Sequence, residues 1–151
     1  MNIARVLASK GIEVVTIGPG QTLCQAVTLL AEHNIGALVV VDGAGAPIGI
    51  VSERDIVRAL ARTERILGET VASIMTREVI IATPQDDLVA AGATMAERHI
   101  RHLPVVEGGR LVGIVSLGDV VKAQRDQYQG EVDTLQIQLL DDQGTTVRKA
   151  S

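Results

Sequence analysis

Two serine–aspartate pairs of identical spacing are the residues of this sequence best suited to ligand chemistry. Ser52 and Asp55 close the segment GIVSERD, and Ser116 and Asp119 close GIVSLGD. In each segment a short β-branched run ends at the serine, where a helical pattern begins, so the serine is predicted to be a helix N-cap. The free N–H groups and positive dipole end of a helix start can bind phosphate. A carboxylate one turn later can accept hydrogen bonds from both hydroxyls of a ribose.

The same spacing has a purely structural interpretation. A serine followed three residues later by an acid also forms a capping box, which stabilises a helix by about 1 kcal/mol. For one copy the two interpretations are evenly matched. The presence of the pattern in both halves of the chain favours ligand binding.

An internal repeat explains why the pattern occurs twice. Residues 13–44 align with 78–109, and residues 46–58 align with 110–122, with 18 identities in 45 aligned positions. Such self-similarity indicates two copies of one structural unit.

Each copy is predicted to fold as β-α-β-β-α, with tight turns between the last two strands. The predicted strands are 13–17, 37–41 and 47–51 in the first copy and 78–82, 103–107 and 111–115 in the second; the predicted helices are 22–33, 53–62, 87–99 and one from 117 onward. Every element has one apolar face, so we expect the two units to pack against each other.

The repeat also sets the expected organisation of the chain. The expected segments are a first repeat with an N-terminal helix (1–62), a charged linker (63–70), a second repeat (71–125), a C-terminal helix (126–141) and a polar tail (142–151). Residues 71–75 are expected to lead into the second copy, and residues 3–9 to play the same part for the first.

Several motifs together give this sequence a specific family resemblance. IMT precedes the second repeat, IRHLPVV opens its central strand, and each repeat closes with G-h-h-S-x-x-D, where h is hydrophobic. This combination resembles a tandem CBS-domain pair (a Bateman module), as in small stand-alone CBS-domain proteins. The resemblance implies an α/β (α+β) fold of two pseudo-symmetric β-α-β-β-α repeats packed sheet to sheet, plus a C-terminal helix.

The resemblance further implies an adenine nucleotide site, in which the base lies between strands and is held by aliphatic side chains and backbone hydrogen bonds. Family sites combine the two repeats, so we expect Ser52 and Asp55 to meet Thr83, Ile100 and Arg101, and Ser116 and Asp119 to meet Gly18, Ile35 and Gly36. The full set of expected nucleotide-binding residues is Gly18, Ile35, Gly36, Ala37, Ile50, Ser52, Arg54, Asp55, Thr83, Ile100, Arg101, His102, Pro104, Ile114, Ser116 and Asp119.

The two copies differ in charge. Arg54 has no counterpart in the second copy, whereas Arg101 replaces a glycine of the first. Both are assigned to phosphate, because arginine suits bidentate phosphate contact; Arg98 is assigned to a solvated face. We therefore expect two sites of different affinity, one of which could hold a larger ligand such as a dinucleotide.

Composition excludes several functions. The net charge is −4 and the only aromatic residue is Tyr128, which argues against nucleic-acid binding, because that function uses basic surfaces and stacking rings. Apolar runs are far shorter than the roughly 20 residues that span a membrane. With three histidines and Cys24 as the only cysteine, no metal site is expected. These features suit a cytoplasmic protein.

After Lys122 the repeat ends but a helical pattern continues. Tyr128, Val132, Leu135 and Leu139 form a stripe with heptad-like spacing. It could dock on the chain's own core, but we favour contact with a second copy, because proteins of the resembled family usually pair.

The resulting functional expectation is a regulatory protein, not an enzyme. It would sense energy or redox state through AMP, ADP, ATP or NAD(H), without a metal, and act through an unknown regulated protein as a homodimer. S-adenosylmethionine is an alternative ligand that uses the arginines poorly. The alternative classes are a weak nucleotide-processing enzyme, a redox enzyme dependent on Cys24, and a structural dimer with vestigial pockets.

Overall fold

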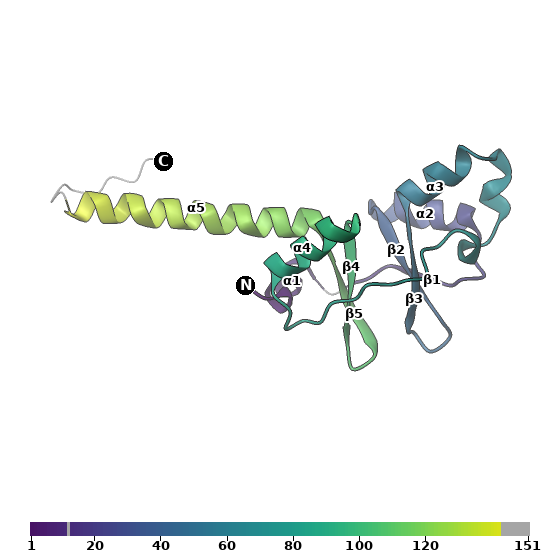
Figure 1. Ribbon diagram of the computed structural model, residues 1–151, viewed down its shortest axis with the longest axis horizontal. Helices are drawn as coiled ribbons and strands as arrows, with labels where there is room; N and C mark the ends of the chain where they lie inside the picture. The colour runs from purple at the N-terminus through teal and green to yellow at the C-terminus, as the bar shows by residue number, and fades with distance from the viewer. Residues whose placement is uncertain (12, 143–151) are drawn as a thin grey trace.

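The computed structural model describes residues 1–11 and 13–142 and divides them into two β/α units (Figure 1). The first unit contains β1 (Thr16–Ile17), α2 (Leu23–His33), β2 (Ala37–Val41), β3 (Pro47–Ser52) and α3 (Glu53–Leu60). The second contains α4 (Leu88–Arg98), β4 (His102–Glu107), β5 (Arg110–Ser116) and α5 (Leu117–Asp142). Helix α1 (Ile3–Lys10) precedes them, and the short 3-10 helices η1 (Glu64–Gly68) and η2 (Val71–Ser73) connect them. The mixed fold and internal repeat predicted from the sequence are confirmed.

The two sheets differ in one strand. In the first unit β1 pairs parallel with β2, which pairs antiparallel with β3. The expected counterpart at 78–82 is not a strand; it forms only a bridge between Ala82 and Val105 beside the β4–β5 hairpin. Pro104 stands where the first unit has Val39. It has no N–H to donate to the neighbouring segment, so the parallel ladder cannot extend past one step.

The helices that follow these segments begin and end within one residue of the bounds predicted at 22–33 and 87–99. Thr22 caps α2 in a reciprocal capping box with Gln25, and the Asp87 side chain accepts from the backbone N–H of Ala90 at the start of α4. Both helices end at a residue in the left-handed conformation, Asn34 at φ 51° and His99 at φ 54°. These equivalent caps end the helices just before β2 and β4.

The lead-in segments are exchanged between the units. We expected residues 3–9 to serve the first copy, but Ile3, Val6 and Leu7 of α1 are buried in the hydrophobic cluster of the second unit. Val71 and Met75 are buried in the cluster of the first unit instead. The buried side chains thus form two clusters, each completed by the segment that precedes the other repeat. Figure 1 shows α1 beside α4 rather than α2.

Equivalent backbone hydrogen bonds fix both exchanged segments. Ala4 N–H donates to the Pro84 carbonyl over 2.8 Å, and Ala72 N–H donates to the Pro19 carbonyl over 3.0 Å. The two prolines are aligned positions of the repeat. Because the two segments dock in the same way, the pseudo-symmetry of the molecule includes residues whose sequences show no repeat.

Two glycines permit this close packing. A Cβ placed on Gly113 of β5 would lie 2.7 Å from Leu7 Cδ2, and one on Gly49 of β3 would lie 2.6 Å from Met75 Sδ. Real Cβ atoms do not approach other heavy atoms so closely. Gly49 and Gly113 occupy aligned positions, so each repeat presents a side-chain-free strand surface to the other's lead-in segment.

Helix α5 continues far beyond the second unit. The helix expected from 117 onward and the C-terminal helix expected at 126–141 form one continuous helix, Leu117–Asp142, of 26 residues. Its distal half projects away from both units (Figure 1). Tyr128, Leu135 and Leu139 are 68%, 58% and 59% exposed, so this stripe does not dock on the chain's own core. The expected tail from residue 143 onward lies outside the described residues.

Candidate functional site

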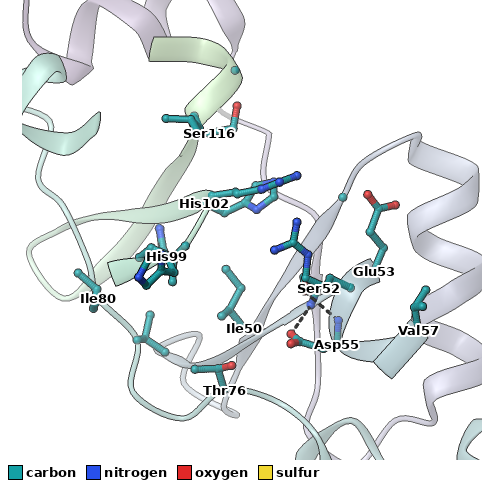
Figure 2. A pocket seen from close by; sticks show the side chains of 18 of the residues that line it. Ile50, Ser52, Glu53, Asp55, Val57, Thr76, Ile80, His99, His102 and Ser116 are labelled. Carbon is teal, nitrogen blue, oxygen red and sulfur yellow. Dashed lines mark hydrogen bonds between the residues drawn. The ribbon is translucent and has the colours of Figure 1, made fainter. Parts of the chain in front are cut away.

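An open cleft of about 1160 Å³ lies between the two units, and both contribute to its walls. Figure 2 shows Ser52, Glu53 and Asp55 of the first unit opposite His102 and Ser116 of the second. Ligand cavities commonly measure roughly 300–1,000 Å³, so this cleft is large enough for more than a mononucleoside. The remaining walls come from the starts of α3 and α5, from the segment after η2 and from the start of β4.

Ser52 and Asp55 form a reciprocal capping box at the junction of β3 and α3. The Ser52 hydroxyl accepts a hydrogen bond from Asp55 N–H at 3.2 Å, and Asp55 Oδ2 accepts from Ser52 N–H at 2.9 Å. Both side chains are half-buried and line the cleft. The structural role and the ligand role are therefore compatible, because the box fixes the carboxylate and leaves Oδ1 without a hydrogen bond among the described residues.

The strand before this junction supplies an apolar wall with a satisfied backbone. Ile50 is half-buried and points into the cleft (Figure 2). Its N–H donates to the Thr76 carbonyl over 3.0 Å, and its carbonyl accepts from Thr76 N–H over 2.9 Å. Ile80 and Ile100 line the cleft as well, so aliphatic side chains from both units face the cavity.

His102 faces the first unit across the cleft. A Cβ on Gly36 would lie 3.6 Å from His102 Cε1 and 3.5 Å from Glu53 Oε1, which places the imidazole and this carboxylate close to the same backbone point. Burial lowers the pKa of His102 below its usual value, and the charge of Lys10 lowers it further, while Asp119 and Glu53 partly oppose this. The side chain is consequently held neutral and can donate or accept a hydrogen bond.

The cleft is lined by more cations than carboxylates, the latter being Glu53, Asp55 and Glu78. Its lining includes five cations, which are Arg54, Arg58, Arg101, Lys122 and Arg125. Within the described residues Arg54, Arg58 and Arg101 take part in no ion pair, so their guanidinium groups remain available to an anion. Guanidinium groups beside a helix start are suited to phosphate.

The second serine–aspartate pair has the same internal geometry but different neighbours. Ser116 N–H donates to Asp119 Oδ2 over 2.8 Å, and Asp119 N–H donates to the Ser116 hydroxyl over 3.1 Å. Asp119 also pairs with Lys10 Nζ at 2.6 Å. Burial alone raises the pKa of Asp119, but hydrogen bonds from Lys10 and Ser116 and the charge of Lys10 outweigh burial, so the pKa is lowered.

The cleft brings together ten of the sixteen residues predicted from the sequence. They are Gly36, Ile50, Ser52, Arg54, Asp55, Ile100, Arg101, His102, Pro104 and Ser116. Ser52 and Asp55 share the cleft with Ile100 and Arg101 as expected, but not with Thr83. Ser116 shares it with Gly36, but not with Gly18 or Ile35. The predicted residues that line the cleft therefore come from both repeats, as we expected for each site.

The other six lie outside the lining of the cleft, namely Gly18, Ile35, Ala37, Thr83, Ile114 and Asp119. Ala37 is buried within β2, and Ile35 packs against the hydrophobic cluster of the first unit. The N–H groups of Gly18 and Thr83 are bound by the side chains of Gln21 and Asp86. The carbonyl of Ile114 accepts from Lys10. Asp119 lines a second cavity of about 620 Å³ together with Lys10 and Arg5.

Sequence patterns gave little sign of several residues in the cleft and its surroundings. Thr76 belongs to the IMT motif, but nothing in the motif shows that its backbone pairs with Ile50. Glu53 lies between Ser52 and Asp55, but its aligned residue is Leu117, so the repeat does not single it out. Lys10 has no counterpart in the repeat and so gave no signal at all.

Other chemistries find little support in the described part of the chain. No group of three or more His, Cys, Asp or Glu residues there could hold a metal ion. Cys24 is exposed on α2 and lies outside the lining of both cavities. Among the described helices none has the length and apolar character needed to cross a membrane.

Comparison with known proteins agrees with this architecture. The CBS domain family model matches residues 7–62 and 71–126. The CBS domain-containing protein YhcV of Bacillus subtilis (strain 168) is 37% identical over 112 residues, which is 74% of this chain and 79% of that protein.

Two solved structures extend the comparison to the fold. The CBS-domain containing protein ATU1752 from Agrobacterium tumefaciens superposes with a TM-score of 0.80 and 39% identity, covering 82% of this chain and 99% of that one. The CBS domain pair of protein MJ0100, in complex with 5′-methylthioadenosine and S-adenosyl-L-methionine, gives a TM-score of 0.76 and 29% identity, covering 84% of this chain and 98% of that one. With both repeats matched by the family model, this chain belongs to the CBS-domain family and is a tandem CBS pair.

Proposed function

We propose that this CBS pair is a regulatory module that binds a phosphorylated adenosine ligand, AMP, ADP, ATP or NAD(H), in the cleft between its repeats. The observation that carries the proposal is the meeting of three ligand-binding features in one cleft. Asp55 is fixed at a helix start, Ile50 and Ile100 offer apolar walls, and arginines that form no ion pair within the described residues lie beside them. The similar CBS pair of MJ0100 binds two adenosine compounds, which supports the ligand class.

Each part of the ligand has a counterpart in the cleft. The adenine would lie against the aliphatic side chains, because the lining residues include no Phe, Tyr or Trp for stacking. The ribose hydroxyls would donate to Asp55, and the phosphate would meet the N-terminal end of α3 together with Arg54 and Arg101. The arginines favour a phosphorylated ligand over S-adenosylmethionine, because guanidinium groups pair with phosphate.

The proposed output is a change in a surface that a partner protein reads, rather than a reaction. Ligand binding would bias the relative position of the two units, since both line the cleft. It can do so only as far as the ligand prefers one arrangement over the other. We assign pairing with a second copy to the stripe of Tyr128, Val132, Leu135 and Leu139 on α5, in which all but the half-buried Val132 are exposed. The 4-3-4 spacing of this stripe suits a helix–helix seam.

Calorimetric titration of the purified protein with AMP, ATP, NADH, S-adenosylmethionine and adenosine tests the proposal directly. AMP should bind, and Asp55→Asn should weaken it. Loss of charge-assisted hydrogen bonds costs about 1.5–3 kcal/mol, which corresponds to about 10–140-fold in Kd. Asparagine can still accept from Ser52 N–H, so the thermal stability should change little.

Asp87→Asn is the matched control, because Asp87 also caps a helix but lies outside the lining of both cavities. This variant should bind AMP like the original protein. The absence of binding for all five compounds would refute the proposed function. Equal weakening by Asp55→Asn and Asp87→Asn would show that the assigned carboxylate is wrong.

A further inference from the structure

The side chain of Lys10 lies against the second serine–aspartate pair, Ser116 and Asp119. Its Nζ lies 2.6 Å from Asp119 Oδ2 and donates a second hydrogen bond to the Ile114 carbonyl over 3.0 Å. These partners belong to the repeat that α1 completes, not to the repeat that follows α1 in the sequence. One ammonium group therefore bridges the carboxylate and the strand that correspond to Asp55 and Ile50 in the first repeat.

The first repeat satisfies the same strand position with backbone atoms. There the Ile50 carbonyl accepts from Thr76 N–H, in the segment after η2. The corresponding segment after α1 runs differently, because Leu7 precedes Glu13 by six residues whereas Met75 precedes Glu78 by three. The additional residues include Lys10 in the last turn of α1, and its side chain takes the place that Thr76 N–H has in the other repeat.

This contact separates the two members of the second motif. Ser116 lines the main cleft, but Asp119 lines only the second cavity, where Lys10 lies against it. In the first repeat Ser52 and Asp55 both line the main cleft. A ribose that needed Asp119 would meet a carboxylate already paired with an ammonium group at 2.6 Å, whereas Asp55 takes part in no ion pair within the described residues. The side chains of Asp119 and Lys10 are 20% and 36% exposed, so solvent screens this pair in part.

We propose that Lys10 closes the second nucleotide site, so that each chain binds a single nucleotide, at Ser52 and Asp55. This inference rests on the proposed function, since it concerns which of the two repeated motifs can take the ligand. Lys10 is then the residue that determines site occupancy. The two repeats thus have the same fold, but because of the Lys10 side chain on α1 only one of their two motifs takes a nucleotide.

The contact itself can be tested without any nucleotide. The chain has three lysines, Lys10, Lys122 and Lys149, so the side-chain ammonium region of the nitrogen-15 NMR spectrum is simple. We expect a Lys10 ammonium signal protected from exchange with water, and loss of that protection in Asp119→Asn. Asp126→Asn is the control, because Asp126 lines the same cavity and its replacement should leave the signal unchanged.

Occupancy is tested by calorimetric titration with AMP. The original protein should bind one AMP per chain and Lys10→Met should bind two, because methionine keeps the apolar stem and removes the ammonium. Asp55→Asn should leave only weak binding, and Lys10→Met combined with Asp55→Asn should regain one site. Arg5→Met is the control, since it removes a cation from the same helix while keeping Lys10, and its stoichiometry should stay at one.

The outcomes separate this inference from the proposed function. Two AMP molecules bound to the original protein, or an unchanged stoichiometry in Lys10→Met, would overturn the inference while the proposed function stands. A protein that binds AMP only after Lys10→Met would support the closing role and refute the assignment of the open site. A Lys10 signal indifferent to Asp119→Asn would overturn the contact, and no AMP binding by any variant would overturn both proposals.

Discussion

Replacement of Gly113 by alanine tests the exchange of lead-in segments between the repeats. The new methyl group would lie 2.7 Å from Leu7 Cδ2 and 2.9 Å from Leu7 Cδ1. Leu7 is only 5% exposed and belongs to the hydrophobic cluster of the second unit, so moving its side chain aside would disturb buried neighbours. If α1 packed on the first repeat instead, Gly113 would face no such obstacle.

The magnitude follows from the packing. Forcing one extra carbon into a filled core costs about 1–3 kcal/mol, and Leu7→Ala alone should cost about 2–5 kcal/mol because it leaves a cavity. In the double variant the methyl group added by Gly113→Ala occupies space that the Leu7 side chain has vacated, so the second substitution should cost almost nothing. The two sites should therefore couple by about 1–3 kcal/mol.

Urea unfolding of the original protein, both single variants and the double variant measures this coupling. For a chain of this length, Gly113→Ala alone should also lower Tm by about 2–12 °C. Gly130→Ala is the control, because nothing lies within 4 Å of its added methyl group on α5 and the substitution should raise helix stability. Strict additivity of Gly113→Ala and Leu7→Ala would refute the exchanged packing.

Three further perturbations address the charged groups and α5. The pKa values of His102 and Asp119 are lowered in the fold, so each contributes stability that is present above its unfolded pKa and lost as pH falls through its folded pKa. The free energy of unfolding should thus decrease as the pH falls through the unfolded pKa of His102, 6.5, and decrease again below that of Asp119, 3.8. His102→Gln should remove the first decrease and leave the second. Arg101→Met should weaken AMP binding about tenfold or more and leave adenosine binding unchanged, as measured by calorimetry. Leu135→Glu should convert a dimer to a monomer in light scattering, because like charges would meet in the apolar seam.

Each of these expectations has a contrary result. A pH dependence that His102→Gln leaves intact would assign the titration to another group. Equal loss of AMP and adenosine binding in Arg101→Met would place that arginine away from the phosphate. A monomeric original protein, or a dimer insensitive to Leu135→Glu, would remove α5 from the interface.

Local chemistry explains which elements could be predicted from the sequence. Thr22 and Asp87 sit at the helix starts where short polar side chains replace missing backbone partners, and such caps depend on residues three positions away. The prediction of a strand at 78–82 was wrong because the neighbouring strand, β4, contains Pro104. A sequence window shows that the run is β-branched, but not that the neighbouring strand lacks the N–H needed to extend the ladder.

The exchanged lead-in segments could not be predicted, because their partners are distant in the sequence. Leu7 and Met75 lie in short apolar patterns that could pack on either repeat, and the structure buries each in the unit that does not follow it in the sequence. Gly49 and Gly113 were the only available signal, since both fall inside β-branched strands where glycine weakens packing unless another chain segment approaches.

In the candidate site, the internal repeat predicts the geometry of each serine–aspartate box but not the access of a ligand to it. The two serine–aspartate boxes agree in every internal hydrogen bond, because the box depends on a serine and an aspartate three positions apart, and the repeat preserves both. Access to each carboxylate depends instead on the exchanged segment, where the repeat is no longer preserved. Thr76 meets Ile50 through its backbone and leaves Asp55 facing the cleft, whereas Lys10 meets Ile114 through an ammonium that also reaches Asp119. A segment outside the motif thus gives identical motifs different access to a ligand. The residue responsible is Lys10, whose ammonium group pairs with Asp119.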